Sequence, residues 1–169
     1  MGAVGRETPD IRHEHWLGGV SVRLVLDADR TGDRFVIVEH RLGPRELMAP
    51  MHRHTHEDAY TIVVEGSVGF VLGEDTHIAG VGEVIQKPRD QWHTFFNAGD
   101  TPARVLEIIS PPGLERYFAE LVLYFPADGS PDLEGMADAS ERYGLDMDFD
   151  SLAPLVERHS LASPPEMGT

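Results

Sequence analysis

The feature that most constrains the fold is a series of short apolar runs with strand-like alternation between residues 20 and 109. The runs cover residues 20–26, 35–42, 60–64, 67–72, 76–78, 83–86, 94–96 and 104–109. Glycine, proline, asparagine and aspartate stand between them, and these residues favour turns. Many short strands at this spacing indicate an all-β sandwich or barrel.

The hydrophobic period changes after residue 110, from the alternation of strands to the spacing of amphipathic helices. Three helices are expected, at residues 113–124, 132–143 and 151–159. Asp132 or Ser130 would cap the second helix, and Gly144 would end it. The third would tolerate Pro154. The sequence thus predicts a helical extension after the strands.

A chain of 169 residues is long enough for one domain with a sizeable core and too short for two of ordinary size. Trp16, beside a Gly-Gly turn, is expected to pack under the barrel or a helix. The predicted organisation is a disordered N-terminus at 1–10, a β-barrel at 11–110, helices packed on it at 111–160 and a disordered tail at 161–169.

Charge and composition exclude several classes of protein. The chain has 14 basic and 29 acidic residues and a net charge of -15, which argues against binding nucleic acid, since such binding relies on Lys and Arg contacts to phosphate. No apolar run approaches the roughly 20 residues of a membrane helix, and no secretory signal is visible, so a cytoplasmic protein is expected. Without cysteine, any metal must be held by imidazole or oxygen. Lys87, the only lysine, is expected in an exposed turn.

Two histidines one residue apart, His52 and His54, suggest half of a metal site. In an extended segment, side chains at i and i+2 leave the same face, so both imidazoles could reach one ion. The alternative is a polar loop in which these histidines and His56 contact water. His93 begins a later run, where a barrel could place it opposite the pair.

The two histidine segments together resemble the paired motifs of the cupin superfamily. His52, His54 and the closing Gly66 match the first motif. Matching the second motif are Gly82, Pro88, His93 and Asn97, while Asp90 replaces its second glycine. The resemblance covers about residues 16–120, and the run KPRDQWHTFFNAGDTPARVLEIISPPGLERYF is similar to bacterial quercetin-dioxygenase-like cupins. It implies a double-stranded β-helix, or jelly-roll barrel, with a metal at the three histidines; Asn97 is expected to cap a turn.

One position departs from the family pattern. The glutamate that usually provides a fourth ligand, and sometimes a base, is Ala59 here. Strand alternation places Asp58 on the opposite face, so it should not substitute. His56 and Glu57 lie in the connecting turn, and either could swing inward; both are candidate catalytic residues. An apolar pocket is expected from Ala59, Thr61, Phe70, Trp92 and Phe95.

The resemblance implies a metal-dependent oxidoreductase, dioxygenase-like, acting on a small aromatic or enolic compound. Its cofactor would be one divalent transition metal, with Fe, Mn, Ni, Cu and Zn left open. Two alternatives remain: a non-catalytic small-molecule-binding cupin, and a zinc-type non-redox cyclase or isomerase. Tyr60, Ile62 and Val64 would make the outer face of their strand apolar, which predicts a homodimer.

Overall fold

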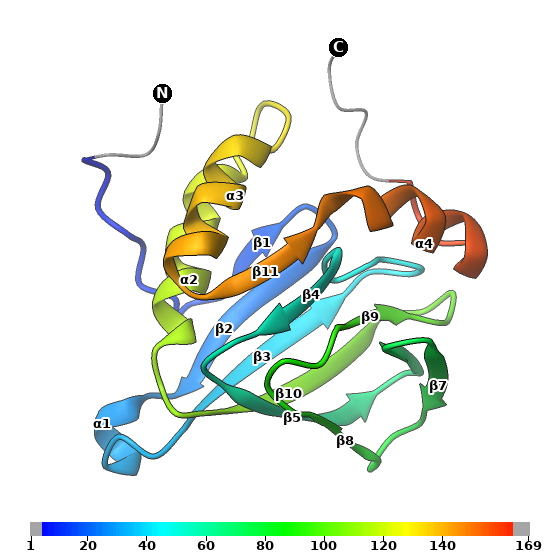
Figure 1. Ribbon diagram of the computed structural model, residues 1–169, viewed down its shortest axis with the longest axis horizontal. Helices are drawn as coiled ribbons and strands as arrows, with labels where there is room; N and C mark the ends of the chain where they lie inside the picture. The colour runs from blue at the N-terminus through cyan, green and yellow to red at the C-terminus, as the bar shows by residue number, and fades with distance from the viewer. Residues whose placement is uncertain (1–4, 164–169) are drawn as a thin grey trace.

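The computed structural model describes residues 5–163, and within them two antiparallel sheets face each other. The first has the order β1-β2-β3-β10-β5-β8 and the second the order β11-β4-β9-β6-β7. The first sheet contains β1 (His15–Leu17), β2 (Val20–Leu26), β3 (Val36–Leu42), β10 (Ala103–Ser110), β5 (Asp58–Glu65) and β8 (Val84–Lys87). The second contains β11 (Leu145–Asp148), β4 (Met51–His54), β9 (His93–Asn97), β6 (Val68–Leu72) and β7 (Asp75–Ala79). The predicted all-β architecture, a jelly-roll barrel, is confirmed (Figure 1).

The core lies between the two sheets, and the two longest strands, β5 and β10, alternate buried side chains with more exposed ones. In β5, Ala59, Thr61 and Val63 are buried while the residues between them are partly exposed, as the alternation predicted. Fully buried Val105 of β10 and Phe70 of β6 lie on the same inner side. Buried apolar surface of this kind supplies the main stabilisation of the barrel.

The C-terminal region contains the three predicted helices and one strand that the sequence did not predict. The helical elements are α2 (Leu114–Leu121) with a 3-10 turn at Val122–Tyr124, α3 (Leu133–Arg142), and α4 (Leu152–His159) with a 3-10 turn at Phe149–Ser151. Asp132 caps α3 through a hydrogen bond from Gly135 N of 2.9 Å, and Gly144 follows its end with φ of 71°. Figure 1 shows α2 and α3 together at one end of the sheets and α4 further along.

Strand β11 hydrogen-bonds to β4, so the C-terminal extension completes the sheet that carries all three histidines (Figure 1). Its four residues are too short to give a recognisable alternation, and only the exposed edge of β4 makes them a strand. Residues expected to be a turn form a short helix, α1 (Ala28–Thr31), capped by Asp27. Trp16 is 51% exposed, so its predicted packing is wrong.

Asn97 has the predicted turn-capping role. It is fully buried, and its Nδ2 lies 2.9 Å from Gly43 O and 2.7 Å from Thr101 O, while its Oδ1 accepts from Gly99 N at 2.9 Å. The predicted disorder at 1–10 and 161–169 falls partly outside the described residues. No helix in the described part is both long enough and apolar enough to span a membrane.

Candidate metal centre

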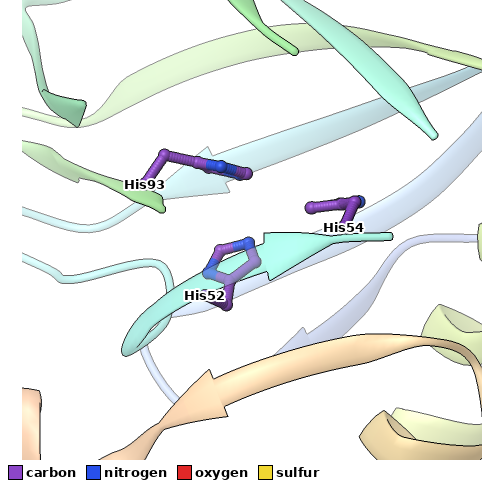
Figure 2. Close-up of side chains that lie close together, drawn as sticks. All are labelled: His52, His54 and His93. Atoms are coloured by element: carbon purple, nitrogen blue, oxygen red, sulfur yellow. The ribbon is translucent and has the colours of Figure 1, made fainter. Parts of the chain in front are cut away.

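Three histidines from two neighbouring strands converge inside the barrel. His52 and His54 project from β4, and His93 comes from β9, where it is the register partner of His52. Each offers a ring nitrogen, and these atoms lie within 4.8 Å of one another. Figure 2 shows the rings of all three turned toward a shared space. Their exposed fractions are 9%, 6% and 1%, so the cluster is screened from solvent.

Backbone carbonyls fix the orientation of two rings. His52 Nδ1 donates to Pro50 O at 2.8 Å, and His93 Nδ1 donates to Gln91 O at 2.9 Å. Since a carbonyl only accepts, each Nδ1 must carry the proton, and each Nε2 keeps a free lone pair. His93 Nε2 is buried and has no hydrogen-bond partner among the described residues. This nitrogen is therefore available to a metal.

The third ring, His54, has a different neighbour. Its Nδ1 is buried without a hydrogen bond in the described part of the chain, and it lies 3.8 Å from Glu57 Oε2, which also has no partner there. Glu57 is buried, and this burial raises the pKa of its carboxyl group. The structure thus places the Glu57 carboxyl group beside a ligand-type histidine rather than in solvent.

Burial keeps all three imidazoles neutral. It lowers the pKa of His52 to about 4 and that of His54 to about 3, and it lowers the pKa of His93 further. Neutral imidazoles are the form that binds metals, and three of them leave coordination positions open on a divalent transition ion. The buried and unpaired nitrogens fit such an ion, as the sequence predicted; its identity is not determined by three nitrogen donors.

The side chains expected near the missing fourth ligand face in different directions. Ala59 faces the interior and provides no donor. Asp58 faces outward as predicted, and its carboxylate pairs with Arg89 at 3.0 Å. His56 is exposed, and its ring lies beside Gly144, so the structure does not bring it to the histidine cluster. The chain after β4 turns His56 outward and Glu57 inward.

Four of the five predicted pocket residues lie in the interior of the barrel. Ala59, Thr61, Phe70 and Phe95 are all buried, whereas Trp92 is half-buried with the Arg53 guanidinium 5.3 Å from its ring. Two hollows lie elsewhere: one of about 190 Å³ is lined by residues of α4 together with Met51, Val71, Gly73 and Ser151, and one of about 350 Å³ lies between residues 8–11 and α2.

Sequence reasoning missed a polar cluster on the sheet opposite the histidines. Lys87, predicted to be exposed, is 2% exposed and forms an ion pair with buried Glu107. The prediction was wrong because β8 continues one residue beyond the expected strand, which turns Lys87 inward with Ile85. His40 and Thr61 also hydrogen-bond to Glu107. Strand alternation extended through residues 84–87 would have predicted that the Lys87 side chain faces inward.

Comparison with known proteins supports the assignment of the fold. The cupin domain family matches residues 38–109, which include both strands of the histidine cluster. This chain has the cupin fold. The family match supports membership of the cupin superfamily, whereas the quercetin-dioxygenase-like subtype is not established by it. A search of curated protein sequences found no match to the chain.

Several solved structures are similar to this chain. A sugar phosphate isomerase from a cupin superfamily, from Silicibacter pomeroyi, is 26% identical with a TM-score of 0.50, over 57% of this chain and 62% of that one. This chain therefore spans less than two thirds of that isomerase. KdgF from Halomonas sp. is 16% identical with a TM-score of 0.55, over 66% of this chain and 98% of that one. A predicted oxalate decarboxylase from Thermotoga maritima is 18% identical with a TM-score of 0.53, over 61% and 88%. The last two show the fold alone.

Proposed function

We propose that this cupin is a metal-dependent oxidoreductase, dioxygenase-like, that acts on a small aromatic or enolic compound. His52, His54 and His93 would hold one divalent transition metal. The observation that carries the proposal is the convergence of three buried, neutral imidazoles, with a ring nitrogen of His93 that has no partner among residues 5–163. A buried polar atom without a partner is costly, and a metal would satisfy it.

The residues around the cluster have distinct roles in this proposal. When bound, the metal would supply a Lewis acid with open positions for substrate oxygens. Hydrogen bonds to Pro50 O and Gln91 O hold His52 and His93 in the tautomer that binds metal. Glu57 would accept the proton of the phenol or enol, because its buried carboxyl group has a raised pKa suited to a base. His56, which is exposed, has no role in this proposal.

The test of the redox proposal is oxygen consumption. Metal-free protein is loaded in turn with Fe²⁺, Mn²⁺, Ni²⁺, Cu²⁺ or Zn²⁺ and supplied with acetylacetone as an enolic probe or catechol as an aromatic one. We expect oxygen uptake with at least one redox-active ion and none with Zn²⁺. Bound redox-active metal without any oxygen uptake for either probe would contradict the oxidoreductase assignment.

The role of Glu57 is tested with a matched pair of variants. Glu57→Gln should lower kcat about a hundredfold, within the range of general-base catalysis, while metal content stays the same. Asp58→Asn changes the adjacent carboxylate, which faces outward and pairs with Arg89, and should leave kcat unchanged. Equal losses in both variants would show that Glu57 is not the base.

A second candidate is a non-redox isomerase or cyclase with the same metal site. It is favoured by the 26% identity to the cupin sugar phosphate isomerase. Product formation in the absence of oxygen, with Zn²⁺ as active as the other ions, would support this candidate over the first.

We further propose that the protein is a homodimer. Tyr60, Ile62 and Val64 lie partly exposed on the outer face of β5, next to the edge strand β8 of the first sheet, where a second copy could cover them. Light scattering at micromolar concentration should give the dimer mass, whereas a monomer mass would refute this proposal.

A further inference from the structure

A buried cluster of four polar residues lies on the inner face of the first sheet. The Lys87 cluster consists of His40 from β3, Thr61 from β5, Lys87 from β8 and Glu107 from β10. None of the four is more than 5% exposed. Burying charged groups is expensive, so their presence inside the barrel calls for a physical reason.

Glu107 is fully occupied by its neighbours. Its Oε1 accepts from the Lys87 ammonium and from the Thr61 hydroxyl, the latter at 3.4 Å, and its Oε2 lies 3.0 Å from His40 Nε2. Burial alone would raise the pKa of Glu107, but the Lys87 charge and the His40 hydrogen bond hold it well below the usual value. Glu107 therefore anchors Lys87 and is not free to bind a metal.

The hydrogen bonds fix the net charge of the cluster. His40 Nδ1 lies 2.9 Å from Ser21 O and must carry a proton, since a carbonyl only accepts. A second proton must lie between His40 Nε2 and Glu107 Oε2, whichever atom holds it. With the Lys87 ammonium, the sum is one positive charge. The interior of this acidic protein is thus locally cationic.

The Lys87 ammonium faces the second sheet, which carries the histidines. Lys87 is the register partner of Ala59, whose side chain is buried on the same inner face of the first sheet. Its Nζ lies 4.8 Å from the ring centroid of Phe95, which is two residues along β9 from His93.

The Lys87 ammonium has donors to spare. An ammonium donates three hydrogen bonds, and within residues 5–163 its only acceptor is Glu107 Oε1. A divalent ion on three neutral imidazoles would add two positive charges beside it. The Glu57 carboxylate beside His54 would contribute one negative charge, which is fewer than the two positive charges of the ion. Positive charge therefore exceeds negative charge on both sides of the interior.

We propose that Lys87 binds an anionic oxygen of the substrate opposite the metal, so that this site selects small oxyanions such as carboxylates and enolates. The inference rests on the proposed metal-dependent function and names its substrate class. One oxygen of the anion would bind the ion, and another would accept from the free donors of Lys87, whose position is held by Glu107. A neutral molecule would leave the excess positive charge uncompensated.

The test uses Co²⁺ as the metal, because its visible absorption reports ligand binding without requiring turnover. Cobalt-loaded protein is titrated with oxalate, a small oxyanion, and separately with imidazole, a neutral metal ligand. The variant is Lys87→Met, which removes the charge and leaves His40 and Glu107 as a balanced pair. The matched control is Ile85→Met, on the same strand and the same face without a change of charge. Cobalt content is measured after each titration.

We expect Lys87→Met to weaken oxalate binding about tenfold to a hundredfold, the usual loss for a charged hydrogen bond, with imidazole affinity unchanged. Cobalt affinity should rise, since a like charge has been removed. Oxalate affinity equal in Lys87→Met and wild type would overturn the proposal, as would parallel losses for both ligands.

The failure of the inference differs from the failure of the proposed function. If the wild-type protein binds no cobalt, the metal site and the inference are both wrong. If cobalt binds and the oxalate affinity of Lys87→Met equals that of the wild type, only the inference fails. Should Lys87→Met not fold, the double variant Lys87→Met with Glu107→Gln, in which both charges are replaced by neutral side chains of similar size, takes its place with the same expected losses.

Discussion

The charge count of the Lys87 cluster predicts an asymmetry between its two ion-pair partners. Glu107 is the only anion of the cluster, so Glu107→Gln leaves the buried Lys87 ammonium without a counter-charge. Lys87 is 2% exposed, and removing the partner of such a charge costs about 3–5 kcal/mol of unfolding free energy. Lys87→Met instead leaves Glu107 hydrogen-bonded to His40 and Thr61, and should cost only about 1 kcal/mol.

The double variant, Lys87→Met with Glu107→Gln, is the fourth protein to compare. With both charges removed, the interior holds neutral side chains of similar volume, and the unfolding free energy should return to within about 1 kcal/mol of wild type. The assay is urea unfolding of metal-free protein, followed by circular dichroism, for the four proteins. A folded domain has about 5–15 kcal/mol of stability, so even Glu107→Gln should be measurable. A Lys87→Met loss as large as that of Glu107→Gln would refute the charge count.

Three further predictions concern the barrel as a whole. Folding lowers the pKa of His52 to about 4 and that of His54 to about 3, so below pH 6.5 the unfolded chain binds more protons than the folded one. Metal-free protein should therefore lose about 1.4 kcal/mol of unfolding free energy per pH unit for each histidine as the pH falls from 6.5 to about 4. Constant stability in urea unfolding across this pH range would contradict the prediction. Asn97→Ala removes the donor to Gly43 and Thr101 carbonyls and should cost about 3 kcal/mol in the same assay, with a loss below 1 kcal/mol as the contrary result. Gly144→Ala forces a side chain into a left-handed conformation at φ of 71° and should lower stability by about 1–2 kcal/mol; an unchanged melting midpoint would count against it.

The sequence predicted the barrel and the histidine cluster for a definite physical reason. Strand alternation and turn residues are local signals, and the inward side of β5 follows from them directly. Convergence of His52 and His54 with His93 needed the two motifs to be considered together. Once both strands are in the same barrel, the i and i+2 spacing brings two rings to one point.

What the sequence could not predict depends on pairing between distant segments. Strand β11 forms because β4 offers an edge, and nothing local in four residues indicates it. The buried pair of Lys87 and Glu107 joins two strands that do not neighbour each other in the sheet. Lysine is so often exposed in proteins that the residue type alone predicts an exposed position for Lys87. Only the register of β8 against β5 shows that its side chain faces inward. His56 and Glu57 share one turn, and local rules do not decide which of them faces inward.

The central claim is that His52, His54 and His93 together hold one divalent transition metal. The most direct measurement is anomalous diffraction from a crystal of metal-saturated protein, collected at the absorption edge of the ion. The account predicts one anomalous peak about 2.0–2.2 Å from a ring nitrogen of each histidine, at the Nε2 atoms of His52 and His93. A crystal of saturated protein with no peak between the three rings would contradict it.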